Sequence, residues 1–102
     1  MTPEQIVKKQ ICDWLELNGA LFTLHVRTFN RKFSSSKHMR AGWPDIHGVW
    51  KDGRALLIEV KAKGGTISEE QMRIIIKAKS LGGHAFFAYS LEDVQRELKG
   101  KS

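Results

Sequence analysis

The sequence predicts a mixed α/β fold built as a single domain over residues 1–102. Apolar residues recur at helical spacing near both ends and in the third quarter of the chain, which predicts three helices. Two other segments have the length and pattern of strands, and an Asp-Gly step joins a further pair of apolar runs. The expected order is helix, three strands, helix, strand and helix. A chain of this length can bury one core, so we expect no separate second domain.

The first expected helix covers residues 3–18. Thr2, Pro3 and Gln5 match a helix start, with a capping threonine, a proline in the first position and a glutamine three residues after the cap. The pattern ends near Asn18. The apolar stripe consists of Val7, Ile11, Trp14 and Leu15.

The next segment, residues 21–28, alternates between apolar and polar side chains, which predicts a half-buried strand. Its apolar side comprises Phe22, Leu24 and Val26, and its polar side comprises Thr23, His25 and Arg27.

A β-hairpin is expected where Asp52 and Gly53 separate two largely apolar runs, at residues 45–50 and 54–61. The loop contains two residues, or three if Gly53 adopts the left-handed conformation as a bulge. We expect the three-residue loop, residues 51–53, or a bulge elsewhere in these strands.

The register of this hairpin decides whether Asp45 and Glu59 share a face, because side chains alternate with a period of two. A two-residue loop would set Asp45 opposite Val60 and leave Glu59 on the other face. A three-residue loop sets Asp45 opposite Glu59 and places Lys61 on the same face. The same register gathers an apolar set on the opposite face: Ile46, Trp50, Leu56, Ile58 and Val60.

The second half of the chain adds a helix, a strand and a helix. Ser68 and Gln71 repeat the capping pattern before a helix over residues 69–80. Residues 84–89 predict an apolar strand, and Ser90 caps the last helix. The apolar residues expected to face the core are Met72, Ile75 and Ile76 in the first of these helices and Leu91, Val94 and Leu98 in the second.

Asp45, Glu59 and Lys61 carry the chemistry that the sequence suggests most strongly. Carboxylates on one face are ligands that Mg²⁺ or Mn²⁺ prefers, and such an ion activates water and polarises a phosphodiester. Lys61 would orient that water or neutralise developing charge. The alternative is that all three are ordinary surface charges. Against it stands Glu59, which lies in an apolar run where burial without a partner is costly.

The net charge of +6 is unevenly distributed along the chain. Between Glu16 and Asp45 there is no acidic residue, and the stretch contains Arg27, Arg31, Lys32, Lys37 and Arg40. A basic stretch before a candidate metal-binding carboxylate indicates contact with DNA phosphates and little sequence specificity. The alternative is a solvated loop without a ligand.

The composition argues against several classes of protein. No apolar run approaches the ~20 residues of a membrane span, and the first residues resemble no signal peptide. Cys12 is the one cysteine, which permits no internal disulfide and favours a reducing cytoplasm. The histidines are scattered and form no zinc spacing. His47 is expected on the face of Asp45, in a structural or phosphate-contacting role.

The residues 42–45, Gly-Trp-Pro-Asp, followed by residues 58–61, Ile-Glu-Val-Lys, resemble the signature of the PD-(D/E)xK nuclease superfamily. Within it the chain is similar to the VRR-NUC family, and in size to its small stand-alone phage members, which suggests a phage or bacterial origin. The likeness covers nearly the whole chain. It implies a central mixed sheet flanked by helices.

The resemblance also implies roles for individual residues. Asp45 and Glu59 would be metal ligands, the Val60 carbonyl a third ligand, and Lys61 the catalytic lysine. Glu4 matches an acidic residue that many members add from the first helix, and Gln71 a glutamine near the active site. Helix capping explains Gln71 equally well, and the helix dipole favours an acid such as Glu4 in a first turn whatever its function.

The expected function is therefore a metal-dependent endodeoxyribonuclease using Mg²⁺ or Mn²⁺. The resemblance implies branched DNA, such as a four-way junction in replication, recombination or repair, as substrate. Paired cuts at a junction need two active sites, so a homodimer is expected. The alternatives are a DNA-binding module without catalysis and a nuclease for flaps, single strands or duplex.

Overall fold

The computed structural model describes residues 1–25 and 41–101. Its elements follow the predicted order of helices and strands. They are α1 (Pro3–Leu17), β1 (Leu21–Leu24), β2 (Ile46–Val49), β3 (Ala55–Val60), α3 (Glu69–Ser80), β4 (His84–Ala88) and α4 (Leu91–Leu98). Of the strand expected over residues 21–28, the part from residue 26 onward lies outside the described residues.

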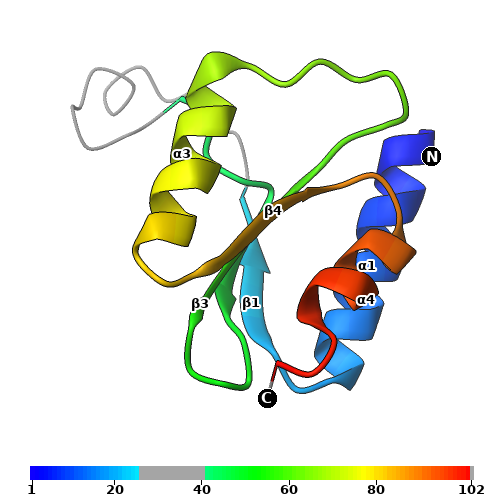
Figure 1. Ribbon diagram of the computed structural model, residues 1–102. Coiled ribbons are helices and arrows are strands. Elements are labelled where there is room, and N and C mark those ends of the chain that lie inside the picture. The colour runs from blue at the N-terminus through cyan, green and yellow to red at the C-terminus, as the bar shows by residue number, and fades with distance from the viewer. Residues whose placement is uncertain (26–40, 102) are drawn as a thin grey trace, which may run out of the picture.

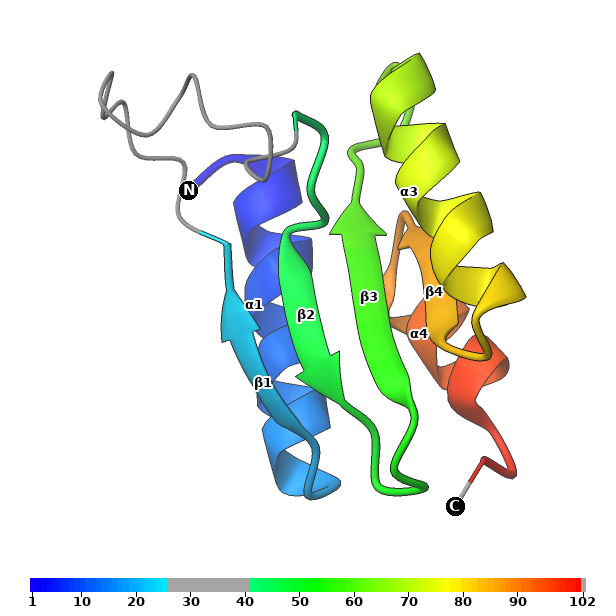
Figure 2. The ribbon, with the colours of Figure 1, turned by 90° about the vertical axis from the view of Figure 1, so that its left-hand side faces the viewer.

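The four strands form one mixed sheet in the order β1-β2-β3-β4 (Figure 2). The pairs β1–β2 and β2–β3 are antiparallel, whereas β3 and β4 are parallel. A parallel neighbour requires a crossover, and α3 provides it between β3 and β4. The sheet therefore combines an N-terminal hairpin region with one β-α-β unit.

Helices cover both faces of the sheet, which produces three layers (Figure 1). Helices α1 and α4 lie together on one face, and α3 lies on the other, against β3 and β4 (Figure 2). Among the described elements no helix covers the β1–β2 half of the α3 face. On that half of the sheet, Leu21 is 76% exposed and Val49 is 41% exposed.

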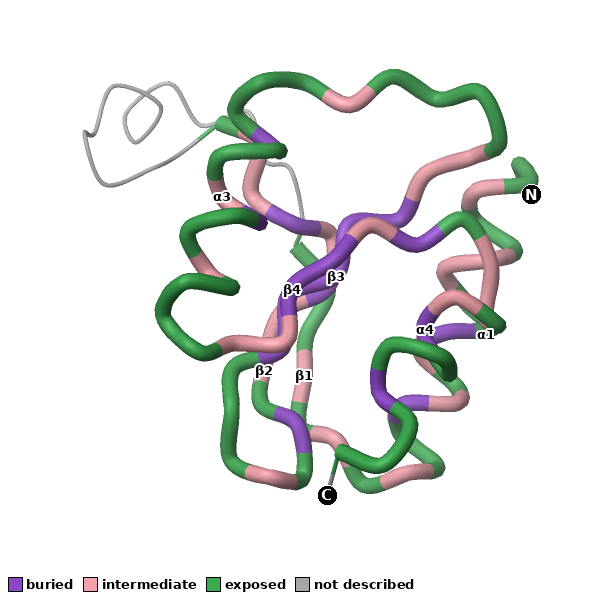
Figure 3. Tube along the Cα trace, viewed as in Figure 1, coloured by how far each residue is buried: buried purple, intermediate pink, exposed green. Residues whose placement is uncertain are grey.

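The main core lies between the sheet and helices α1 and α4, and Figure 3 shows the buried residues concentrated there. The apolar hairpin face predicted from the register is confirmed, since its members all belong to this core: Ile46, Trp50, Leu56, Ile58 and Val60. Ile11 and Leu15 of α1 are fully buried against it, and Val7 and Trp14 pack at its border. In β1 only Phe22 packs against the core, while Leu24 is 45% exposed because β1 is an edge strand.

A smaller core on the α3 face consists of Leu57, Ile75 and Ala85. The stripe expected on this helix was partly wrong, because Met72 is 40% exposed and Ile76 is 59% exposed. The residues that face the sheet recur at i, i+4 and i+7, and the first of them is the polar Gln71, which is buried. A buried polar side chain at that place needs a partner, and it finds one in the site described below.

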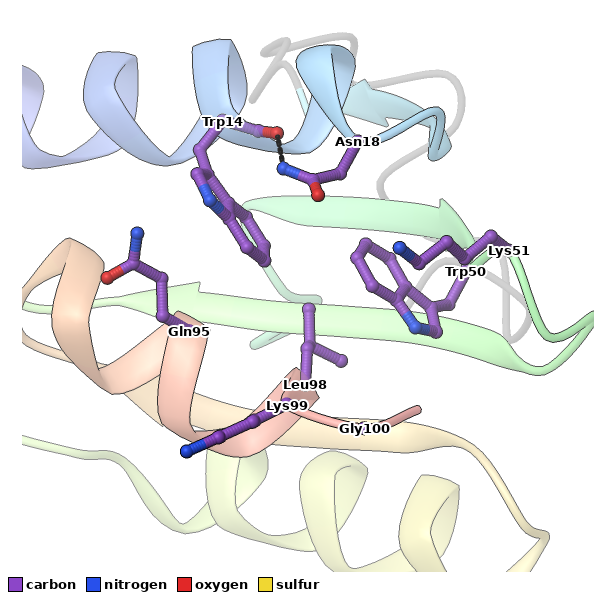
Figure 4. Close-up of a pocket in the computed structure, with 8 residues that line it drawn as sticks. All are labelled: Trp14, Asn18, Trp50, Lys51, Gln95, Leu98, Lys99 and Gly100. Atoms are coloured by element: carbon purple, nitrogen blue, oxygen red, sulfur yellow. Dashed lines mark hydrogen bonds between the residues drawn. The ribbon is translucent and has the colours of Figure 1, made fainter. Parts of the chain in front are cut away.

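Trp50 directly follows β2, at the end of the strand remote from Asp45. Its ring stacks on Trp14 with centroids 5.9 Å apart. Its indole N–H donates to the carbonyl of Lys101 and so anchors the segment after α4. A pocket of about 340 Å³ lies beside these rings (Figure 4). It is lined by Trp14, Asn18, Trp50, Lys51, Gln95, Leu98, Lys99 and Gly100. The predicted site residues are not part of it.

None of the helices in the described part of the chain is both long enough and apolar enough to span a bilayer.

Candidate active site

The β2–β3 hairpin has the register that the three-residue loop predicts. Ile46 pairs with Ile58, so Asp45 stands opposite Glu59 just beyond the last paired residues. The Trp50 N–H donates to the Arg54 carbonyl over 2.9 Å, which closes a loop of residues 51–53. Gly53 has φ +86°, the left-handed conformation of a bulge glycine. This bulge puts both carboxylates on one face of the sheet.

Asp45 and Glu59 are tied together through each other's backbone. The Asp45 N–H donates to Glu59 Oε1 over 3.2 Å, and the Val60 N–H donates to Asp45 Oδ2 over 3.1 Å. At this end of the β2–β3 ladder, hydrogen bonds from backbone N–H groups to the two carboxylates replace a further backbone–backbone pair. As a result the two carboxylates meet at one end of the sheet. Figure 2 shows this end, where β2 begins and β3 finishes.

Glu59 is buried, with only 1% of its surface exposed. Burial raises the pKa of its carboxyl, and hydrogen bonding to Asp45 and the charge of Asp45 raise it further, to about 8. The charge of Lys61 and the N–H of Asp45 act in the opposite direction. Glu59 therefore holds a proton at neutral pH unless a cation replaces it.

Asp45 is the charged member of the pair. Burial on its own would raise the pKa of Asp45, but the hydrogen bond from Glu59, the charge of Lys8 and the Val60 N–H together hold it below its ordinary value. The two carboxyl groups thus hold one proton and one negative charge between them at neutral pH, as expected for carboxylates in contact.

Gln71 connects α3 to this pair. Its amide Nε2 donates to Glu59 Oε2 over 2.6 Å, while its amide oxygen accepts from the Ser68 N–H over 2.9 Å. The Gln71 N–H in turn donates to the Ser68 hydroxyl, which completes the capping box. Capping and contact with the site were the two alternatives for Gln71, and the structure shows both, because a carboxamide carries a donor and an acceptor.

Lys61 follows β3 directly, and strand alternation places it on the side of Glu59. The charge of Lys61 lowers the pKa of Glu59. The Val60 carbonyl points to the same strand edge as the Val60 N–H, toward β2. Extending the register two residues beyond Ile46 sets Pro44 opposite Val60, and proline has no N–H to donate. The Val60 carbonyl is thus left without the ladder hydrogen bond that another residue at position 44 would offer.

The residues before Asp45 pack against the start of α3. Gly42 has φ +79°, and a side chain there would come within 2.8 Å of the Gln71 backbone nitrogen. Trp43 packs on the smaller core and meets the ring of His47 edge-on, with centroids 5.9 Å apart. His47 also lies edge-on to His25 at 6.3 Å, on the β1–β2 half of the sheet. His47 is thus on the face of Asp45, as alternation predicts.

Lys8 of α1 is a residue of this site that the sequence analysis missed. Its Nζ lies 3.5 Å from Asp45 Oδ1. A signal was present, since Lys8 follows Val7 and precedes Ile11 by three residues, at the border of the apolar stripe. A lysine at such a border covers its aliphatic stem and directs its ammonium to a neighbouring anion.

Glu4 lies in the first turn of α1, half-buried and one helical turn before Lys8. Within residues 1–25 and 41–101, no three acidic, histidine or cysteine side chains come together as a ready-made metal site. The structure therefore brings Asp45 and Glu59 together without Glu4 as a third neighbour. The basic residues expected to contact DNA lie outside the described residues: Arg27, Arg31, Lys32, Lys37 and Arg40.

The donor atoms at this end of the sheet fit a hard divalent cation. Two carboxylates and one backbone carbonyl are oxygen ligands of the type that Mg²⁺ and Mn²⁺ prefer. An ion there would also replace the proton that Glu59 holds. The positive charge of the ion would then compensate the negative charge of the two buried carboxylates.

A mixed sheet between helices, with a Pro-Asp and a Glu-x-Lys side by side at one sheet end, defines a nuclease core of the PD-(D/E)xK type. The model of the VRR-NUC domain matches residues 3–92, which is most of the chain, and the chain belongs to the VRR-NUC nuclease family. The predicted resemblance and fold class are thereby confirmed.

A solved structure described as a VRR_NUC domain has the same fold. It superposes with a TM-score of 0.74 at 21% sequence identity, and the match covers 100% of each chain. Comparison with curated proteins gives no match.

Proposed function

We propose that this member of the nuclease family is a metal-dependent endonuclease that hydrolyses phosphodiester bonds of DNA. One observation carries the proposal: Asp45 and Glu59 are held together at the end of the hairpin. Strand alternation puts Lys61, two residues after Glu59, on the same side. This grouping is what hydrolysis assisted by a divalent ion requires.

Each residue then has a defined task. Asp45, Glu59 and the Val60 carbonyl would hold Mg²⁺ or Mn²⁺, and the ion would supply an activated water and a polarised phosphate. Gln71 fixes the rotamer of Glu59 through its 2.6 Å hydrogen bond. Lys61 would position the attacking water or neutralise charge that develops on the phosphate. Glu4 is proposed as an additional acidic contributor from α1, on the family resemblance.

DNA would reach the site over the basic stretch that precedes Asp45. We propose phosphate contacts by Arg27, Arg31, Lys32, Lys37 and Arg40. Such contacts position a duplex without reading its sequence, so affinity should fall steeply with salt.

Branched DNA is the substrate class that we propose, in replication, recombination or repair. Resolving a four-way junction requires cuts on two strands, so the active unit would be a homodimer with two sites related by symmetry. Light scattering of the protein alone and on junction DNA tests this assembly. A strictly monomeric protein would count against junction resolution and leave nicking possible.

The decisive experiment is a cleavage panel of junction, flap, duplex and single-stranded DNA with Mg²⁺ or Mn²⁺. Asp45→Asn and Lys61→Ala should lower the cleavage rate by about 10²–10⁴-fold while folding is retained. Asp13→Asn and Lys77→Ala change the same charges at exposed helix positions and should leave the rate unchanged.

Undiminished cleavage by either site variant would refute the assignment. A protein that binds DNA equally with and without Mg²⁺, and yields no product on any substrate, would instead be a binding module that has kept the fold.

A further inference from the structure

Lys8 and Gln71 both reach the Asp45–Glu59 pair, but they come from helices on opposite faces of the sheet. The α1 and α3 helices flank the sheet on different faces, and both begin at the end of the sheet where β3 finishes (Figure 1). Lys8 reaches over from α1 to within 3.5 Å of Asp45 Oδ1. The site is thus enclosed from both layers, with a cation on one side and an amide on the other.

The contact is shielded from water more than an ordinary surface ion pair. The side chains of Lys8 and Asp45 are 28% and 12% exposed, whereas those of the neighbouring pair Lys9 and Asp13 are 65% and 64% exposed. Exposed ion pairs contribute little to the stability of a protein, because water and salt screen their charges. A charge that is largely excluded from water needs a compensating partner, so the Lys8 ammonium matters for the charged form of Asp45.

A divalent ion bound between Asp45 and Glu59 would occupy the same electrostatic environment as this ammonium. Two cations within a few ångströms repel one another, and the repulsion is strong where water is excluded. Lys8 has a flexible four-carbon stem and is still partly exposed, so it can withdraw toward solvent.

We propose that Lys8 is a positioning residue that takes the place of the divalent ion beside Asp45 in the metal-free protein and gives way when the ion binds. Lys8 then compensates the charge of Asp45 before the ion arrives, and it lowers the affinity of the site for the ion. The inference rests on the proposed metal-dependent function and adds a residue that sets how readily the metal enters.

The test compares metal binding by the wild-type protein with that of Lys8→Met, which keeps the aliphatic stem and removes the charge. Calorimetric titration with Mg²⁺ and Ca²⁺, without DNA, should show about tenfold tighter binding by Lys8→Met, equivalent to about 1.4 kcal/mol. Thermal unfolding in a chelator should show a lower midpoint for Lys8→Met than for wild type, because Asp45 has lost its partner.

Two matched variants separate this role from a general charge effect. Lys9→Met removes the same charge one residue further along α1, where the lysine pairs with exposed Asp13, and should bind the ions as wild type does. Lys8→Arg keeps the charge and should also retain wild-type affinity. If Lys8→Met does not fold without metal, Lys8→Gln is measured in its place.

Unchanged or weaker binding by the neutral Lys8 variants would overturn the inference while the proposed function stands. A wild-type protein that shows no Mg²⁺ or Mn²⁺ binding sensitive to Asp45→Asn would overturn the metal-dependent function, and the inference with it.

Discussion

Glu59 lies between Asp45 and Gln71, with only 1% of its surface exposed. Its pKa of about 8 stands well above the ordinary value of 4.5, chiefly because of burial and then because of Asp45. In the unfolded chain the carboxyl loses its proton near its ordinary value, so raising the pH from about 4.5 to about 8 favours the unfolded state. Asp45, whose pKa is lowered, exerts its own effect only at more acidic pH.

Glu59→Gln should therefore remove a pH dependence from the metal-free protein. Denaturant unfolding in a chelator should show wild type losing stability relative to Glu59→Gln between pH 5 and pH 8, by on the order of 2–4 kcal/mol. Parallel stability curves over this range would contradict the assignment of the proton to Glu59. Divalent ions displace that proton, so their affinity for wild type should rise with pH over the same window.

The start of α3 both caps the helix and contacts the candidate active site. Ser68 caps the helix, and the Gln71 amide completes the capping box with one atom and holds Glu59 with the other. The hairpin shows the same combination, since the loop of residues 51–53 both terminates the strands and sets the register that pairs Asp45 with Glu59. Local structure and candidate chemistry are therefore coupled in both elements.

Ser68→Ala and Gln71→Ala should separate the two tasks of this helix start. Ser68→Ala removes the capping hydroxyl and should cost about 1 kcal/mol with little effect on DNA cleavage. Gln71→Ala should cost more, because the buried Glu59 carboxyl also loses a hydrogen bond, and should slow cleavage. Unfolding and cleavage assays on both variants measure this, and equal losses of cleavage would show that Gln71 acts through the cap alone.

At the scale of the whole molecule, the site exists because three layers meet at one end of the sheet. Lys8 comes from α1, Asp45 and Glu59 from the hairpin and Gln71 from α3. Gly42 lets the segment before Asp45 approach α3, because the chain there has φ +79° and passes closely over the backbone of Gln71. The segment and the helix are thereby held in contact.

Gly42→Ala should disrupt this junction, and Gly64→Ala is its matched control. Both glycines have positive φ, +79° and +84°, so both variants carry a backbone penalty of about 1–2 kcal/mol. Only at Gly42 would a methyl group also meet backbone, since nothing lies within 4 Å at Gly64. Thermal unfolding should therefore show the larger loss for Gly42→Ala, together with slower cleavage. Similar losses for both variants would show that the close approach is unimportant.

Much of the fold could be predicted because the relevant interactions are local. Helical and strand periodicity, the capping residues and the Asp-Gly turn depend on neighbours a few residues apart, and they predicted the order of elements and the register. The stripe on α3 was partly misassigned, because the polar Gln71 faces the core and no hydrophobicity pattern indicates this.

The sequence by itself determined the order of elements and the family, and it predicted the hairpin register that pairs Asp45 with Glu59. Only the tertiary structure decided that Lys8 reaches Asp45 and that Gln71 contacts Glu59 as well as capping its helix. These contacts join residues from different layers, and the pKa of Glu59 depends on the burial that the layers create together. Burial and contact across layers arise from packing of the whole chain, so no local pattern carries them.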